Sequence, residues 1–110
     1  MGYLIDGVDK ETDPEGYLIE ADFSDEAVRV IAAAEGIELS ENHWKVIAFM
    51  RDRYREDGHT PNFRNMLKEV SESVLPGCVS KDLYDLFPTG PAKQACKVGG
   101  LPQPLGKGGY

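Results

Sequence analysis

The cysteines and histidines of this sequence are the side chains best suited to nucleophilic chemistry or metal binding. There are two of each, Cys78 and Cys96, and His43 and His59. Neither histidine has a second one at the helical spacing of a metal-binding pair, and no third or fourth cysteine completes a zinc site. A phosphate-binding glycine loop and a serine nucleophile motif are also missing. We therefore expect no metal and no cofactor, and thiol chemistry is the type of reaction that remains.

Cys96 lies in a segment with the pattern of a short helix. Lys93 precedes it by three residues on the same helical face, and Lys97 follows it directly. Ammonium groups favour the thiolate, which is the reactive form, whereas the C-terminal end of a helix disfavours it. A single cysteine on an apolar helical face also packs well as a small hydrophobic residue. The sequence thus leaves open whether Cys96 is a reactive thiol or a core residue.

Cys78 follows Gly77 in a predicted loop, where we expect its side chain to be exposed. A disulfide with Cys96 requires the two Cα atoms to lie within about 7 Å of each other, and the sequence does not fix that distance. Two cysteines are too few for the disulfide framework of a small secreted domain. This cysteine usage favours a reducing compartment.

The elements that must position Cys96 are predicted from turn residues and apolar periodicity. Asp6-Gly7 and the Pro14–Gly16 turn indicate that the first twenty residues form a small β-meander. From Ser24 onward, apolar residues recur at helical spacing, which predicts helices over residues 25–35, 41–57, 61–74, 81–87 and 92–98. The predicted N-caps of the first four helices are Ser24, Ser40, Thr60 and Ser80.

These elements predict an α+β fold, mostly α, in which a small antiparallel β-meander packs on a bundle of about five helices. A chain of 110 residues can bury an adequate core without disulfides, so we expect a single domain over residues 1–99. The meander occupies residues 1–20 of this domain and the helices residues 24–99. Residues 100–110 are rich in glycine and proline and are predicted to form a flexible C-terminal arm.

The formal net charge of −7 is distributed unevenly along the chain. Acidic residues concentrate in the first fifty positions and none follows Asp85, whereas Lys93, Lys97 and Lys107 lie beyond it. An acidic body argues against nucleic acid as a partner, because phosphate neutralisation needs clustered Lys and Arg. No apolar run approaches the roughly 18 residues of a membrane span, and Asp6 comes too early for a signal peptide. We expect a cytoplasmic protein.

Residues 86–104 read LFPTGPAKQACKVGGLPQP, and this string resembles the C-terminal signature of the DsrC/TusE sulfur-relay family. Residues 13–18 (DPEGYL), 36–44 (GIELSENHW) and 51–54 (RDRY) match the family in the same order, so the resemblance covers nearly the whole chain. It implies a compact, mostly helical fold with an N-terminal β-meander and a mobile C-terminal arm. It also implies a sulfurtransferase-type activity, with dissimilatory sulfite reductase or sulfur-donor proteins as partners.

The resemblance further implies that a cysteine at the penultimate position of the arm carries sulfur. It does so as a persulfide, or in a disulfide or trisulfide with a second cysteine eleven positions earlier. Cys96 matches the earlier cysteine, and Lys107 occupies the position of the sulfur-carrying one. An intramolecular bridge on the arm therefore cannot form, since lysine has no sulfur. Cys96 is the candidate catalytic residue, as a persulfide or as a mixed disulfide with a partner.

Partner binding is a second role for the arm. Its lysines suit an acidic groove, and its proline-rich segment loses little entropy on docking. The predicted partner-binding residues are Lys93, Lys97, Leu101, Pro102, Pro104 and Lys107.

Two alternatives stay open. The first is a non-catalytic regulatory or scaffold protein of sulfur metabolism, without thiol chemistry. The second is a DNA-binding regulator, because residues 41–57 and the helix after Pro61 resemble a helix-turn-helix. Arg64 and Lys68 lie on the later helix of this pair, but two basic residues are few for a DNA-binding surface on an acidic chain.

Overall fold

The computed structural model describes residues 2–103 and begins with a β-hairpin. Strands β1 (Gly2–Ile5) and β2 (Val8–Glu11) are antiparallel. The two residues between them, Asp6 and Gly7, have positive φ angles of 49° and 78°. Both angles belong to the tight hairpin turn that the Asp-Gly pair predicts.

The third strand of the predicted meander is reduced to a single β-bridge between Thr12 and Leu18. Between the two bridged residues, the Asp13 carboxylate accepts hydrogen bonds from the backbone N–H groups of Glu15 and Tyr17, which closes a tight loop. Tyr17 and Leu18 then both turn into the core, whereas successive residues of a strand point to opposite faces. The predicted N-terminal antiparallel strands are present as a two-stranded hairpin, and the third segment of the meander is an anchored loop joined by one β-bridge.

Helices α1 (Asp25–Ala34) and α2 (Glu41–Asp57) begin at the predicted caps. The hydroxyls of Ser24 and Ser40 each accept a hydrogen bond from the backbone N–H three residues further on. α2 ends at Gly58, whose φ of 78° is left-handed and stops the helix.

The next helix starts two residues later than predicted. α3 (Phe63–Glu69) is capped by Asn62, whose side chain accepts the backbone N–H three residues on at 2.9 Å. Thr60 and Pro61 therefore precede the helix instead of opening it. The chain continues from α3 directly into a π-helical turn, η1 (Val70–Val74).

Two short helices complete the described chain. α4 (Ser80–Leu86) has Val79 as its N-cap instead of the following serine, and the Asp82 carboxylate accepts the N–H of Val79 at 3.0 Å. α5 (Pro91–Val98) begins with proline at its first position, directly after Gly90 and one residue before the predicted range.

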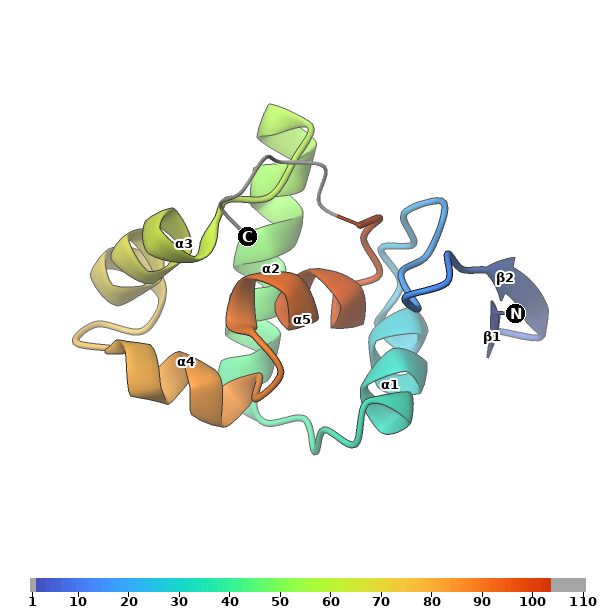
Figure 1. Ribbon diagram of the computed structural model, residues 1–110, viewed down its shortest axis with the longest axis horizontal. Coiled ribbons are helices and arrows are strands. Elements are labelled where there is room, and N and C mark those ends of the chain that lie inside the picture. The colour runs from blue at the N-terminus through green and yellow to red at the C-terminus, as the bar shows by residue number, and fades with distance from the viewer. Residues whose placement is uncertain (1, 104–110) are drawn as a thin grey trace.

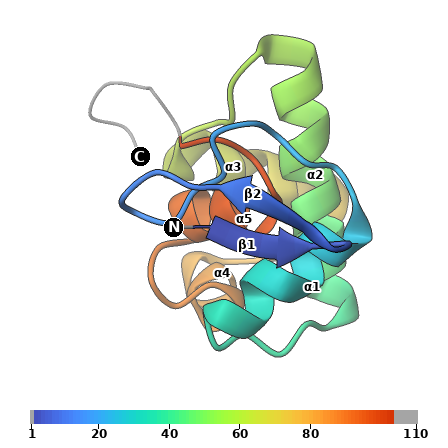
Figure 2. The same cartoon turned by 90° about the vertical axis from the view of Figure 1, so that its right-hand side faces the viewer.

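α5 lies at the centre of the helical bundle. It contacts α1, α2, α3 and α4, and Figure 1 shows it across the middle of the molecule. Figure 2 shows the hairpin in front of α1 and α5. Six of the eight residues of α5 are buried, Cys96 among them. The thiol-bearing helix is thus enclosed by the rest of the fold.

The core draws side chains from the hairpin, from every helix and from the start of the predicted arm. Its largest fully buried side chains include Ile5, Leu18, Ile31, Ile47, Met50, Met66, Leu83, Phe87 and Leu101. The predicted fold class, α+β and mostly helical with N-terminal antiparallel strands, is confirmed. None of the helices in residues 2–103 has the length and apolar character of a membrane span.

Candidate functional site: a covered thiol at the root of the C-terminal arm

The Cys96 thiol is covered. The residue is 1% exposed, and its Sγ donates a hydrogen bond to the carbonyl oxygen of Pro102 at 3.2 Å. Burial raises the pKa of Cys96 to about 12, and a hydrogen bond with Thr60 opposes this rise to a smaller extent. At neutral pH the structure therefore holds Cys96 as an enclosed, protonated thiol, which is the unreactive form.

The cover consists of residues 99–102, which we call the arm root. The Leu101 N–H donates to the carbonyl oxygen of Cys96 at 3.2 Å, and the Leu101 side chain is fully buried. The Gly100 carbonyl accepts the N–H of Asp22 at 2.8 Å. Gly100 has a φ of 76°, and a Cβ added there would lie 2.2 Å from the Asp22 carbonyl oxygen. A side chain at this position would therefore push the arm root away from the body.

Arg51 of α2 binds the arm root from inside the molecule. Its Nε donates to the carbonyl of Gly99 at 2.7 Å, and its two Nη atoms donate to the carbonyls of Asp22, Phe23 and Ser24 at 3.0 to 3.2 Å. The residue is 7% exposed, and burial lowers the pKa of its guanidinium. Arginine stays charged over the ordinary pH range, so a buried cation joins the arm root to the segment before α1.

A polar cleft of about 250 Å³ lies beside Gln103, the residue that follows the arm root. Lys93 is exposed on one of its walls and Lys97 is half-buried. Gln103, the last described residue of the arm, donates a hydrogen bond from its side chain to the Glu15 carboxylate. The residues that line the cleft are Glu15, Tyr17, Thr89, Lys93, Gln94, Lys97 and Gln103. Two of the predicted partner-binding lysines therefore share one cleft with the described end of the arm.

Lys97 is held in place by a network that reaches α1. Its Nζ lies 3.6 Å from a carboxylate oxygen of Glu35 and 5.1 Å from the centre of the Tyr17 ring. The other Glu35 oxygen accepts from Gln94 Nε2 at 3.1 Å, and Gln94 Oε1 accepts the N–H of Thr89 at 3.1 Å. Lys97 is thus engaged inside the protein, which leaves Lys93 as the more accessible of the two cations.

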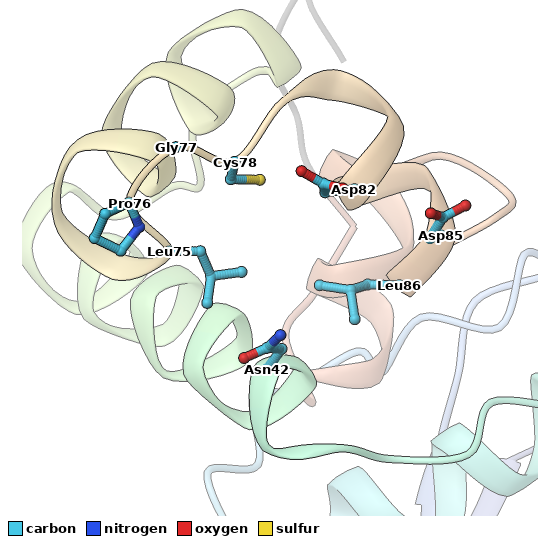
Figure 3. A pocket seen from close by; sticks show the side chains of 8 residues that line it. All are labelled: Asn42, Leu75, Pro76, Gly77, Cys78, Asp82, Asp85 and Leu86. Carbon is cyan, nitrogen blue, oxygen red and sulfur yellow. The ribbon is translucent and has the colours of Figure 1, made fainter.

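Cys78 lies in a different cleft, of about 460 Å³. Figure 3 shows its sulfur pointing into this cleft, with Leu75 and Leu86 on the apolar side and Asp82 nearby. The residue is 9% exposed, so the prediction of an exposed loop thiol was wrong. The reason is the turn after η1, where the Cys78 N–H bonds the Leu75 carbonyl at 3.0 Å and the chain folds inward. Burial and the Asp82 charge raise the pKa of Cys78, and both cysteines are unpaired thiols.

The predicted partner-binding residues separate into three groups. Lys93 and Lys97 line the polar cleft. Leu101 is part of the core and Pro102 covers the thiol, so Leu101 is not on the surface in this conformation. Pro104 and Lys107 lie outside the described residues, as does most of the predicted flexible arm. The catalytic role of Cys96 and the partner-binding roles stay predictions.

Arg51 and Gln94 belong to the site although the sequence interpretation gave them no role. Both fall on buried helical faces, since Arg51 follows the core residue Ile47 by four positions and Gln94 precedes Ala95 and Cys96 in α5. A polar side chain at such a position is rarely buried without hydrogen-bond partners. This mismatch between residue type and predicted face is the signal that could have indicated them.

Fold and site together define a small helical thiol protein whose C-terminal arm is rooted over a cysteine of the central helix. The family model described as "DsrC like protein" matches residues 4–106 of the chain. This match covers nearly the whole sequence and ends one residue before Lys107. The chain belongs to the DsrC-like family, the DsrC/TusE sulfur-relay proteins.

Relatives and solved structures agree with this assignment. The chain is 44% identical to the sulfurtransferase TusE homolog of Haemophilus influenzae, over 91% of this chain and 94% of the relative. It is also 44% identical to the sulfurtransferase TusE of Escherichia coli, over 93% and 95% of the two chains. The solution structure of DsrC from Allochromatium vinosum superposes with a TM-score of 0.85 at 41% identity, covering 93% of each chain. The oxidized γ-subunit of dissimilatory sulfite reductase from Archaeoglobus fulgidus gives a TM-score of 0.82 at 34% identity, over 94% and 97%.

Proposed function

We propose that this chain is a sulfur-trafficking protein of the DsrC/TusE family in which Cys96 is a gated sulfur acceptor. The observation that carries the proposal is the position of the thiol directly under the arm root, hydrogen-bonded to the Pro102 carbonyl at 3.2 Å. A thiol held in this way is inert while the arm root is closed. It becomes available when Leu101 and Pro102 lift away from α5.

The sulfur source that suits such a thiol is a persulfide, carried by a donor protein or present as polysulfide. In the open state Cys96 loses its proton to solvent, and its thiolate attacks the outer sulfur of the donor. The S–S bond of the donor breaks, a persulfide forms on Cys96, and the donor leaves as a thiolate that takes up a proton. One sulfur atom moves between two thiols without net oxidation. Because Lys107 replaces the family's carrier cysteine, the sulfur stays on Cys96.

The proposed partners are proteins of sulfur metabolism, such as a sulfite reductase or a sulfur donor. The relative from Escherichia coli is named a sulfurtransferase, and the structure from Archaeoglobus fulgidus is a sulfite reductase subunit. On this chain, exposed Lys93 at the polar cleft and Pro102 at the arm root are the described residues suited to contact a partner. Pro104 and Lys107 are proposed to extend this surface. The two unpaired thiols fit the proposed cytoplasmic location.

A regulatory or scaffold role without thiol chemistry is the second candidate. The near-complete burial of Cys96 favours it, because a permanently closed thiol exchanges no sulfur. Cys96→Ser separates the two candidates in a capture of partners under non-reducing conditions. A partner held by a mixed disulfide is lost with the sulfur, whereas a scaffold keeps its partner.

The acceptor function is tested by incubating the protein anaerobically with inorganic polysulfide and measuring its intact mass. We expect the wild type and Cys78→Ser to gain about 32 Da, the mass of one sulfur atom, as a persulfide that a reducing agent removes. Cys96→Ser serves as the control and is expected to gain nothing. An unchanged mass in every variant, or an adduct carried by Cys78 alone, contradicts the proposed function.

A further inference from the structure

We infer that Arg51 is a positioning residue whose guanidinium clamps the arm root to the body and thereby sets how often the Cys96 thiol is exposed. The inference rests on the proposed function for the use of the exposed thiol. The clamp itself is argued from the hydrogen bonds and the burial around Arg51.

Three segments that lie far apart in the sequence meet at the Arg51 side chain. Arg51 belongs to α2, its Nη atoms bind the three carbonyls of residues 22–24 ahead of α1, and its Nε binds the carbonyl of Gly99 at 2.7 Å. The arm root and the 22–24 segment are also joined to each other, because the Asp22 N–H donates to the Gly100 carbonyl at 2.8 Å. Arg51 and this backbone hydrogen bond together close the arm root against the body.

The clamp depends on the shape of the guanidinium as well as on its charge. A guanidinium directs Nε to one side and its two Nη atoms to another, so it can hold two separate segments at once. A lysine ammonium is a single point of charge and cannot reach both Gly99 and the 22–24 segment in the same way. With Arg51 only 7% exposed, water does not readily replace the lost donors.

The clamp is connected to the thiol by consecutive residues. Arg51 donates to the Gly99 carbonyl, and the Gly100 carbonyl accepts the N–H of Asp22. The Leu101 N–H donates to the Cys96 carbonyl, and the Pro102 carbonyl accepts the hydrogen bond from the Cys96 sulfur. Loss of the hydrogen bond between Arg51 and Gly99 therefore loosens the arm root, whose last residue, Pro102, covers the thiol. The Leu101 side chain, fully buried, is the remaining apolar anchor of this segment.

Arg53 offers a matched control on the same helix. Its guanidinium makes ion pairs with Glu56, Asp57 and Glu69 at 2.9 to 3.8 Å, and these pairs involve partly exposed side chains. None of these three pairs involves the arm root. Arg53→Lys is thus the same chemical change on the same helix, with no expected effect on Cys96.

The test measures how fast each cysteine of the full chain reacts with iodoacetamide, read separately by peptide mass spectrometry. In Arg51→Lys we expect Cys96 to react at least about tenfold faster than in the wild type, the factor by which loss of a charge-assisted hydrogen bond shifts an opening equilibrium. Cys78, in its own cleft, is the internal reference and is expected to keep its rate, and Arg53→Lys is expected to match the wild type at both cysteines. Gly100→Ala opens the arm root from the other side and is expected to act like Arg51→Lys.

Two results overturn the clamp. One is an unchanged Cys96 rate in Arg51→Lys, whatever the rate in Gly100→Ala. The other is an equal acceleration of Cys78 and Cys96, which means that the whole fold has loosened. Alkylation measures exposure and not sulfur transfer, so the two proposals fail separately. If Cys96 opens in Arg51→Lys and still gains no sulfur from polysulfide, the clamp stands and the acceptor function fails.

Discussion

The chemistry of Cys96 is decided at the scale of the residue by what surrounds its sulfur. Two neighbouring lysines in the sequence favour the thiolate, but Lys97 is bound by Glu35 and Lys93 is exposed to solvent. The dominant effect is the loss of water around the sulfur, which raises the pKa of Cys96 to about 12. Burial therefore outweighs the nearby cations, and reactivity requires a change in exposure.

The raised pKa of Cys96 predicts how stability depends on pH. The folded state holds the thiol proton more tightly than the unfolded chain, whose cysteine pKa is about 9. The stabilisation is thus fully present below pH 9 and is lost as the pH rises toward 12. At pH 10.5 we expect a loss of about 2 kcal/mol in the free energy of unfolding.

Urea denaturation at several pH values checks this expectation. Tyr17 contributes in the same direction, since burial and a charged Cys96 raise its pKa to about 12. In Cys96→Ser the decline above pH 9 should therefore be clearly shallower, and in Cys78→Ser it should change less, because the pKa of Cys78 is raised by a smaller amount. Parallel pH curves for the wild type and Cys96→Ser would show that the thiol is not buried as described.

Replacing the two histidines is expected to change the stability of the fold by different amounts. His43 is 7% exposed, its Nδ1 accepts the N–H of Ser40 at 3.0 Å, and its Nε2 therefore donates to the Leu86 carbonyl at 2.8 Å. His43→Ala removes both contacts and the edge-on packing on Phe87, and we expect a loss of about 2–3 kcal/mol. His59→Ala, at an exposed site, is expected to change stability by less than about 0.5 kcal/mol. Thermal denaturation of the two variants tests the contrast, and equal melting temperatures would refute it.

At the scale of the element, helix starts at serine caps and helix ends at glycine were predictable. Helix boundaries that depend on tertiary contacts were not. Ser24, Ser40 and Gly58 act through local hydrogen bonds or backbone angles, so their role follows from residue type. Thr60 is a residue type that commonly caps helices, but its side chain is buried in the core, and Asn62 caps α3 instead. Tertiary packing here overrides a correct local preference.

The cap of α3 gives a prediction at this scale. Asn62→Ala leaves a helix N–H without its side-chain acceptor, and the expected cost is about 1 kcal/mol. Asn65→Ala, on the exposed side of the same helix, removes a side chain that makes no cap and is the matched control. Chemical denaturation of both variants compares them. A larger loss for Asn65→Ala than for Asn62→Ala would contradict the assigned cap.

The site was also predictable only in part, because its local features follow from the sequence and its tertiary contacts do not. The position of Cys96 on a helix and the nearby lysines follow from spacing and from the family signature. The hydrogen bond between Arg51 and Gly99 does not follow from the sequence, because the two residues are 48 positions apart and their contact depends on how α2 packs on α5. Only the tertiary structure reveals such a hydrogen bond. The burial of Leu101 was not predicted either, since a glycine- and proline-rich segment gives no sign of which of its side chains enters the core.

At the scale of the whole molecule, the fold places the thiol-bearing helix α5 at its centre. α5 is in contact with the other four α-helices, and the arm root lies against the Cys96 sulfur through the Pro102 carbonyl. Acidic residues concentrate in the first half of the sequence, and the fold brings two of them, Glu15 and Glu35, to the lysines at the foot of the arm.

Sulfur uptake by Cys96 in closed and opened forms of the protein tests the central claim most directly. Wild type, Arg51→Lys and Cys96→Ser are each mixed with inorganic polysulfide, and the persulfide adduct of about 32 Da is followed with time by intact mass. A gated acceptor gives an adduct on Cys96 that forms at least about tenfold faster in Arg51→Lys than in the wild type, and none in Cys96→Ser. Equal rates in the wild type and Arg51→Lys, or no adduct on Cys96 in either, would contradict it.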